Sequence, residues 1–202
     1  MMEQYFTKNP TTENKIYRFD WNIGSERFYF NTSNSVFSKS GMDFGSMLLV
    51  ETVIRENGEF SGNILDLGCG YGPIGIILAK FLSKSSVTMS DVNERALELC
   101  LMNAKENSVE ERVKAVNSSA FENISEDYDM IVTNPPIRAG KDVVFSLYEG
   151  AYEHLKEGGK LYVVIQKKQG AASTKTKLEN LFGNCETADK KSGYFIFRAE
   201  KR

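Results

Sequence analysis

Residues 63–73 read NILDLGCGYGP, and this stretch decides the fold of the 202-residue chain. Its first five residues are mostly apolar, which is typical of a short buried strand. Three glycines follow at alternate positions, and Pro73 then stands where its fixed φ suits the first turn of a helix. This order of strand, glycine turn and helix predicts an α/β unit whose turn lets a ligand approach the backbone.

Strand and helix patterns alternate on both sides of this stretch. Strands are expected at Asn63–Leu67, Val87–Asp91, Arg112–Val116, Asp129–Thr133 and Lys160–Ile165. Helices are expected at Asp43–Asn57, with Asp43 as N-cap, and at Pro73–Leu82, Asn93–Asn107, Lys141–Leu155 and Ala171–Phe182. Two last strands, Cys185–Ala188 and Tyr194–Arg198, have no helix between them and should form a hairpin with one antiparallel member. The chain is therefore expected to be a Rossmann-like α/β fold, a seven-stranded, mostly parallel sheet with helices on both faces.

Residues 1–40 are different, because they are polar and aromatic with few long apolar runs. Arg27–Phe30 is strand-like, and the polar run 31–35 follows it. We expect an N-terminal extension, a hairpin or an irregular cover, packed on a main domain that spans residues 41–202. Three aromatic residues of this region, together with Phe44 just after it, are predicted to be core or lid residues rather than residues that stack on a base: Tyr29, Phe30 and Phe37.

The composition excludes several classes of protein. Hydrophobic residues make up 41% and charged residues 26%, which is ordinary for a globular protein. Cys69, Cys100 and Cys185 are odd in number and scattered, which argues against a disulfide framework and for a reducing compartment. The single His154, predicted to lie on the surface at a helix end, and the lack of a Cys-x-x-Cys pair predict no metal site. With neither a signal peptide nor a membrane span in the pattern, a cytoplasmic location is expected.

The net charge of −2 hides an asymmetry between the two parts of the chain. Residues 1–159 hold 15 Lys and Arg against 23 Asp and Glu, and residues 160–202 hold 10 against 4. A basic C-terminal part is typical of a nucleic-acid surface, although a solvated sheet edge has the same composition.

The glycine loop carries the first sign of a ligand. A dinucleotide fingerprint needs G-x-G-x-x-G, whereas Gly68, Gly70 and Gly72 form G-x-G-x-G with Asp66 just upstream. A phosphate would be repelled by Asp66, but the amino group of an amino-acid moiety fits beside it. The loop therefore favours a methyl donor of the S-adenosylmethionine type, the alternative being a glycine turn needed for geometry alone.

Asp91 ends the next expected strand, 25 residues after Asp66. A carboxylate at this place accepts hydrogen bonds from ribose hydroxyls in dinucleotide folds. We assign Asp91, with Val92 beside it, to the cofactor site. The alternative is that Asp91 caps the following helix, but Asn93 is placed to do so.

Asn134, Pro135 and Pro136 follow the fourth expected strand, at the edge where ligands of open α/β sheets bind. The prolines fix the backbone and remove its donors, so a side-chain amide oxygen and backbone carbonyls remain as acceptors. An acceptor pair of this kind suits a planar NH2 group that attacks a methyl carbon. A rigid turn is the alternative for these residues taken alone.

Four basic residues follow strand ends on the same edge: Arg138, Lys141, Lys167 and Lys168. Surface charge spread at random would not be expected to gather where the substrate binds. We therefore predict that these residues contact nucleic-acid phosphates, with Ile137 beside the substrate.

These motifs resemble those of the class I S-adenosylmethionine-dependent methyltransferases. Asp66–Gly72 is similar to their cofactor loop, Asp91 to their ribose-binding acid, and 134–137 to the Asn-Pro-Pro-aromatic motif of amino-group methylators. Over residues 25–200 the chain is similar to the RsmC-type methyltransferases of small-subunit ribosomal RNA, in residues 36–38, 42–46, 134–141 and 166–170. The resemblance implies S-adenosylmethionine as cofactor, ribosomal RNA or a small-subunit particle as partner, and methylation of a guanine 2-amino group.

Three features depart from that family. Larger members carry a second, degenerate domain, for which 202 residues leave no room. Ile137 stands where an aromatic residue is usual, so the target base is expected to stack elsewhere or to pack on an aliphatic side chain. Ser118 and Ser119 replace an acidic residue near the adenine, and Ser119 is assigned to the cofactor site.

Other functions stay open on the residues alone. The same motif serves enzymes that methylate adenine in DNA or RNA, or glutamine in proteins. A non-catalytic RNA-binding module that retains a cofactor pocket is a second alternative. A nicotinamide-dependent oxidoreductase is disfavoured by the G-x-G-x-G spacing and by Asp66.

Overall fold

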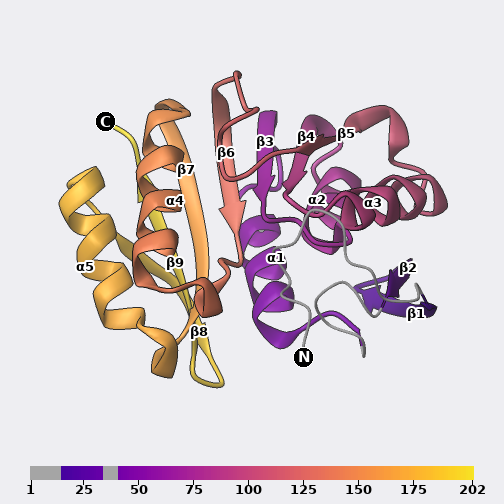
Figure 1. The fold of residues 1–202 in the computed structure, drawn as a ribbon, viewed down its shortest axis with the longest axis horizontal. Coiled ribbons are helices and arrows are strands. Elements are labelled where there is room, and N and C mark those ends of the chain that lie inside the picture. Colours follow the sequence, from indigo (N-terminus) through magenta and orange to yellow (C-terminus); the bar gives the residue numbers. More distant parts are fainter. Residues whose placement is uncertain (1–14, 34–40) are drawn as a thin grey trace.

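A computed structural model describes residues 15–33 and 41–202 of the chain. In this part of the chain, seven strands form one sheet in the order β5-β4-β3-β6-β7-β9-β8, and they lie side by side in Figure 1. The strands are β3 (Ser61–Leu67), β4 (Lys84–Asp91), β5 (Val113–Asn117), β6 (Tyr128–Thr133), β7 (Leu155–Gln166), β8 (Glu186–Lys191) and β9 (Tyr194–Glu200). β9 runs antiparallel to both of its neighbours, and the other pairs are parallel. The predicted seven-stranded sheet with one antiparallel member is confirmed.

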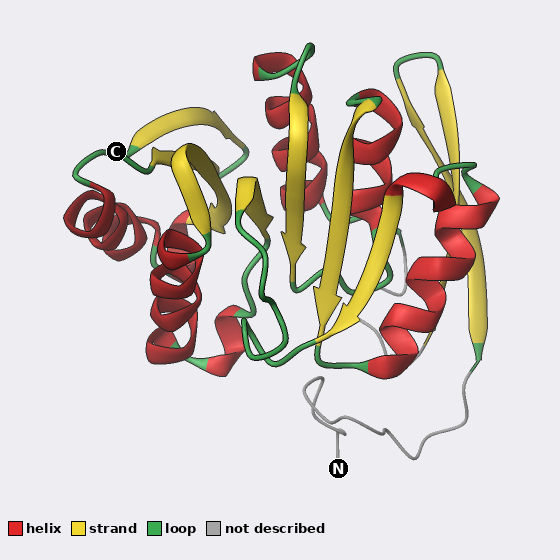
Figure 2. Cartoon of the chain, turned by 90° about the horizontal axis from the view of Figure 1, so that it is seen from above, coloured by secondary structure: helices red, strands yellow, loops and turns green. Residues whose placement is uncertain are grey.

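Helices cover both faces of this sheet (Figures 1 and 2). They are α1 (Phe44–Glu56), α2 (Pro73–Phe81), α3 (Glu94–Glu106), α4 (Lys141–Glu153) and α5 (Ala171–Phe182), with short 3-10 turns η1 (Glu110–Arg112), η2 (Ile137–Ala139) and η3 (Lys167–Gln169). Two apolar clusters result, one on the side of α1, α2 and α3 and one on the side of α4 and α5. Neighbouring strand residues point to opposite clusters, as Ile64 and Leu65 do, because side chains alternate along a strand.

The chain after α4 departs from the expected boundaries. The helix was expected to continue to Leu155, but it ends at Glu153 and Leu155 begins β7. β7 pairs Leu155 with Tyr128 and then Lys160 with Met130, so its extra residues form an irregularity that contains Gly158 at φ +77°. The positive φ of Gly158 lets β7 accommodate these extra residues.

His154 is the C-cap of α4, and its ring is only partly exposed. It stacks on Phe121 with ring centroids 4.6 Å apart. Its ring nitrogens lie 2.9 Å from the Gly150 carbonyl and 3.2 Å from the Ile124 carbonyl. The predicted position at a helix end is confirmed, but the ring is half-buried and holds the loop after β5 against the helix end.

The N-terminal residues that are described form a two-stranded hairpin, β1 (Ile16–Ile23) and β2 (Glu26–Ser33). It lies beside α3 at one end of the molecule, and β8 and β9 lie at the other (Figures 1 and 2). Phe28 and Phe30 are buried against the core, as predicted for Phe30, while Tyr29 is half-buried. Phe37 lies outside the described residues.

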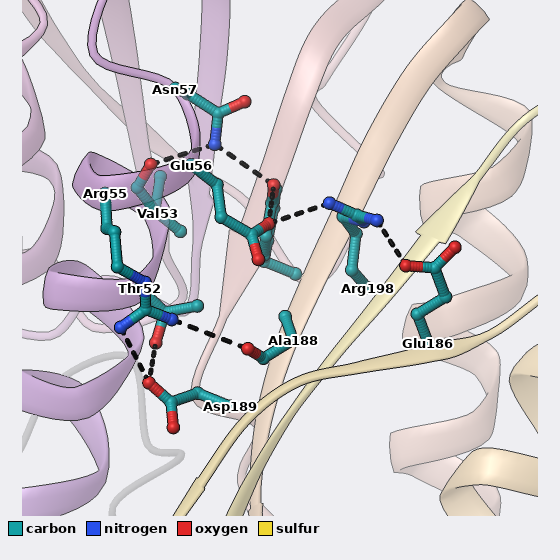
Figure 3. Close-up of polar contacts among 10 residues, drawn as sticks. Thr52, Val53, Arg55, Glu56, Asn57, Glu186, Ala188, Asp189 and Arg198 are labelled. Atoms are coloured by element: carbon teal, nitrogen blue, oxygen red, sulfur yellow. Dashed lines mark hydrogen bonds and ion pairs between the residues drawn. The ribbon is translucent and has the colours of Figure 1, made fainter.

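The C-terminal end of α1 is held on the last strands by a polar network (Figure 3). Glu56 accepts hydrogen bonds from the Tyr162 hydroxyl and from the Arg198 guanidinium, each at 2.9 Å. Arg198 also pairs with Glu186, and Arg55 pairs with Asp189 at 2.8 Å. α1 is thus tied to β7, β8 and β9, which fixes where its other end lies.

Candidate active site

The three sequence motifs meet at one edge of the sheet. β3 lies between β4 and β6, and Leu67 is in register with both Ser90 and Thr133. Gly68 and Asn134 directly follow β3 and β6, Asp91 is the last residue of β4, and the backbone N–H of Gly68 donates to the Ser90 carbonyl at 2.9 Å. The parallel strands thus bring together residues that are far apart in the sequence.

The glycine loop has a left-handed backbone at all three predicted positions, with φ of +76°, +57° and +88° at Gly68, Gly70 and Gly72. The glycines nevertheless have different surroundings. A Cβ on Gly68 would meet open space, whereas one on Gly72 would lie 2.9 Å from the Cys100 sulfur. Gly68 therefore borders space that a ligand can fill, and Gly72 is required by packing.

Asp66 lies beneath this loop and is fully buried. One carboxylate oxygen accepts from the Gly75 backbone N–H at 2.8 Å, and the other has no partner among the described residues. Burial raises the pKa of Asp66 to about 7, opposed by the Gly75 hydrogen bond and reinforced by Asp91. The free oxygen suits a cationic group, which is an observation in favour of the predicted amino-acid moiety.

Asp91 holds the loop rather than the next helix. Its two oxygens accept from the backbone N–H groups of Gly70 and Asn93, each at 2.9 Å. Asn93 itself caps α3, with its side chain accepting from the Arg95 N–H. Burial raises the pKa of Asp91, and the backbone donors oppose this shift. Each oxygen keeps a second lone pair for a hydroxyl donor.

The loop after β5 lies against Asp91 and Val92. The Ser118 N–H donates to the Asp91 carbonyl at 3.0 Å, and the Asn117 amide donates to the Val92 carbonyl at 3.0 Å. Ser119, the next residue, is exposed. Its assignment to the cofactor site remains a prediction on this geometry.

Asn134 is held by the first turn of α1. Its amide nitrogen donates to the Ser46 hydroxyl at 2.9 Å and lies 3.3 and 3.4 Å from the two Asp43 carboxylate oxygens. Asp43 is also the N-cap of α1, as predicted, and accepts from the Ser46 backbone N–H at 3.1 Å. The sequence patterns did not predict the contact with Asn134, although Asp43 and Ser46 both stood in a stretch similar to the RsmC type.

The carbonyls of the two prolines are less free than expected. Pro135 accepts from the Ile137 N–H and Pro136 from the Ala139 N–H, both at 2.9 Å, and these bonds begin η2. The Asn134 oxygen is therefore the freer acceptor of this motif, and the Pro135 carbonyl keeps one lone pair.

The four predicted basic residues lie after β6 and β7, in η2, α4 and η3, and all are exposed. Within residues 15–33 and 41–202, none of them pairs with a carboxylate, whereas Lys175 pairs with Glu179 at 3.5 Å and Lys177 pairs with Glu149. Lys141 lies over the Phe145 ring, 5.0 Å from its centroid. The rim formed by Arg138, Lys141, Lys167 and Lys168 is thus positively charged and open to an anion.

Asn103 of α3 is a second residue that the sequence patterns did not single out. Its amide nitrogen donates to the carbonyls of Asn31 and Tyr71, each at 2.9 Å, and its oxygen accepts from the Asn31 N–H at 2.7 Å. The Tyr71 ring also lies 6.0 Å from Phe19 and Phe30 of the hairpin. The hairpin therefore supports the glycine loop through Asn103, and an asparagine on the apolar face of a helix pattern is the signal that could have pointed to it.

Two other kinds of feature do not occur in residues 15–33 and 41–202. No helix in those parts of the chain has the length and apolar character to cross a membrane. No three His, Cys, Asp or Glu side chains gather there as a metal site would require.

A family model, curated relatives and solved structures that match this chain include several methyltransferases. The family model described as methyltransferase small domain matches residues 27–198. The chain is 44% identical, over 203 residues and 100% of both chains, to the uncharacterized protein YbxB of Bacillus subtilis. It is 31% identical to ribosomal RNA small subunit methyltransferase C of Vibrio parahaemolyticus, over 89% of this chain and 51% of the relative. It thus spans about half the length of that relative.

A solved structure is similar over nearly the whole chain. It is the T. thermophilus 16S rRNA N2 methyltransferase RsmC in complex with AdoMet and guanosine, with a TM-score of 0.83 and 26% identity. The match covers 96% of this chain and 52% of that one. A ribosomal protein L11 methylase of Lactobacillus delbrueckii, at 18% identity and a TM-score of 0.68, shares the fold.

Proposed function

Because the chain belongs to the methyltransferase small domain family, we propose that it methylates the 2-amino group of a guanine in small-subunit ribosomal RNA. It is an S-adenosylmethionine-dependent methyltransferase of the RsmC type. The finer assignment is supported by two relatives, one named for small-subunit ribosomal RNA and one solved with AdoMet and guanosine.

The orientation of the Asn134 amide carries the proposal. Its nitrogen is taken up by Ser46 and Asp43, so its oxygen is the end left to accept a hydrogen bond. An acceptor fixed in this way recognises an N–H donor, and an exocyclic amino group offers two. The Asp43 carboxylate beside the amide nitrogen also makes the Asn134 oxygen more negative, because hydrogen bonds in a chain polarise one another.

S-adenosylmethionine supplies an activated methyl group on a sulfonium. Asn134 and the free lone pair of Pro135 would each accept one N–H of the target, which turns the nitrogen lone pair toward the methyl group. Positive charge grows on that nitrogen during attack, and a fixed acceptor oxygen stabilises it more than it stabilises the neutral amine. The chemistry then rests on position and electrostatics and needs no acid or base that titrates near neutrality.

The cofactor would be held by residues of the other two motifs. Asp66 would receive the amino group with its free oxygen, Gly68 and Gly70 would lie along the amino-acid moiety, and Asp91 would accept from the ribose hydroxyls. Val92 and Ser119 would border the adenine. All of these residues lie at the end of β3, β4 or β5.

The rim supplies the contacts to RNA. Exposed cations without a carboxylate partner bind phosphates at little cost, because no ion pair must first be broken. Because these cations follow β6 and β7, they would hold the RNA strand beside Asn134. This charge disfavours a protein glutamine as the substrate.

Transfer of labelled methyl groups tests the proposal. The protein is incubated with S-adenosylmethionine labelled on its methyl group and with RNA, DNA and protein fractions from cells that lack its gene. Free 16S ribosomal RNA and small-subunit particles form separate arms. We expect label in 16S RNA and, after digestion, in N2-methylguanosine. Label in methylated adenine or glutamine would contradict the guanine assignment, and no label in any fraction would favour a non-catalytic module.

A further inference from the structure

Two aromatic rings, one exposed and one half-buried, form a pair at the start of α1. Phe44, the first residue of α1, and Tyr194, the first residue of β9, have ring centroids 5.5 Å apart at an angle of 51°. Phe44 is 41% exposed, which excludes the core position but not the lid position that the sequence predicted. A single exposed apolar residue is ordinary on a protein surface, so it is the position of Phe44 beside the site that points to a role.

This aromatic pair lies beside the amide that would receive the target amino group. Phe44 directly follows Asp43, whose carboxylate lies 3.3 Å from the Asn134 nitrogen. Tyr194 is in register with Gln166, the last residue of β7. The pair therefore lies at the same sheet edge as Asn134, on the side of β7 and β9.

Gly45 is what lets the rings lie so close. A Cβ on Gly45 would lie 2.9 Å from two ring carbons of Tyr194 and 3.1 Å from the Asp43 carboxylate. The Tyr194 ring and the carboxylate thus flank the same backbone position. Any larger residue there would push the ring away from the start of α1.

Ile137, which follows the Asn-Pro-Pro motif, packs away from the site, against the apolar cluster of α4 and α5. It lines a cavity of about 150 Å³ together with Val144 and Phe145. No aromatic ring stands at that position to stack on a base. Phe44 is an exposed ring next to Asp43, and the contacts of Asp43 tie it to Asn134.

We propose that Phe44, supported by Tyr194, is the platform on which the target base stacks during methyl transfer. The inference rests on the proposed function, and it names how the same site holds a nucleobase. A base drawn out of an RNA stack loses its neighbours, and an aromatic face replaces them. Every base has such a face, so the platform adds affinity while Asn134 selects the amino group.

The first test is steady-state methylation of unmodified 16S ribosomal RNA. Phe44→Ala should lower kcat/KM by about 5- to 100-fold, the range found when a stacking residue is removed, and Phe44→Trp should restore most of it. S-adenosylmethionine affinity should stay unchanged, and the melting temperature should fall only a little, because Phe44 is 41% exposed and loses its contact with the Tyr194 ring. Leu101→Ala, which removes a 52% exposed side chain on α3, is the matched control and should behave as wild type.

The second test measures stacking without catalysis. In Phe44→Trp, guanosine monophosphate added with S-adenosylhomocysteine should quench the new tryptophan. The wild-type protein, whose single tryptophan is Trp21 in β1, serves as the blank. Wild-type kinetics in Phe44→Ala together with no quenching would overturn the platform. If the wild-type protein methylates no RNA, the proposed function fails, and the quenching experiment with guanosine and adenosine monophosphates decides the platform by itself.

Discussion

The two halves of the site are built in opposite ways. Around β3 and β4 the functional side chains are buried and largely satisfied by the chain itself, as Asp91 is by Gly70 and Asn93. Around β6 and β7 the cations are exposed and without carboxylate partners in residues 15–33 and 41–202. In the first half the polar groups find most of their partners within the protein, whereas in the second half the cations are left to pair with a ligand. Changes in the first half should thus alter cofactor binding and stability, and changes in the second should alter only the substrate steps.

The largest effect is expected from Asn134→Ala. Loss of a fixed acceptor that acts mainly in the transition state should lower kcat by about 10²–10³ and leave S-adenosylmethionine affinity nearly unchanged. Single-turnover transfer at saturating RNA measures it. A rate within about threefold of wild type would remove the acceptor mechanism and the reason for naming an amino group.

Asp91→Ala is the corresponding change in the cofactor half. This variant removes two hydrogen bonds to a charged group, each worth about 1.5–3 kcal/mol, so S-adenosylmethionine should bind at least tenfold more weakly. Because Asp91 also holds the Gly70 N–H, the melting temperature should fall as well. Calorimetry that finds unchanged affinity in the folded variant would exclude Asp91 from the site.

Asp43→Ser separates two roles of one residue. Serine caps a helix about as well as aspartate, so α1 should keep its stability, but the carboxylate beside the Asn134 nitrogen is gone. We expect kcat to fall about tenfold, which corresponds to about 1.4 kcal/mol, with the KM for RNA little changed. Asp43→Ala should lose the cap in addition and about 1 kcal/mol of stability. Equal kcat in wild type and Asp43→Ser would reduce Asp43 to a cap.

The rim should give a smaller effect per residue. If Arg138, Lys167 and Lys168 each bind one phosphate, replacing any of them by alanine should flatten the slope of log affinity for RNA against log salt by about 0.7–0.9. The triple alanine variant should keep its cofactor affinity. A wild-type protein whose RNA binding does not depend on salt would show that the rim binds no phosphate.

The smallest effect concerns one proton. Burial raises the pKa of Asp66 to about 7, and a bound ammonium would lower it again, so cofactor binding near pH 6.5 should release part of a proton. Calorimetry in two buffers of different ionisation enthalpy measures this, and Asp66→Asn should abolish it. The raised pKa also means that, between about pH 4 and 7, Asp66 is more protonated in the folded state than in the unfolded state. The free energy of unfolding, relative to Asp66→Asn, should therefore fall as the pH rises from about 4 to 7 and then level off; a flat difference would contradict the raised pKa.

The fold and the location of the site could be predicted from the sequence because both depend on local patterns. The apolar strand before Gly68 and the glycine turn are each complete within a short stretch, and parallel strand ends must meet at one edge. The hydrogen bond between Asp43 and Asn134 joins residues 91 positions apart. No local period encodes such a pair, so the partner of the amide was not predicted.

Phe44 and Leu155 illustrate a second reason. Apolar type alone suggested a core or lid position for Phe44, but the position of its ring depends on its neighbour Gly45 and on Tyr194, which is far away in the sequence. Leu155 suited the end of a helix pattern, and tertiary pairing with Tyr128 placed it in a strand instead. Side-chain type predicted what these residues could touch, and the topology decided which of those pairs form.

The hydrogen bonds of Asn103 to Asn31 and Tyr71 also determine when, during synthesis, the hairpin can pack onto the rest of the protein. Asn31 is synthesised 72 residues before Asn103, the asparagine to which its backbone N–H donates. At about 5–20 residues per second, the hairpin waits roughly 4–14 s for its partner helix. During that time Phe28 and Phe30 have no complete core to enter, because α3 has not yet been synthesised. Nascent chains stalled shortly before Asn103 should therefore be the ones that a chaperone or a protease captures, and chains stalled well beyond it should escape both.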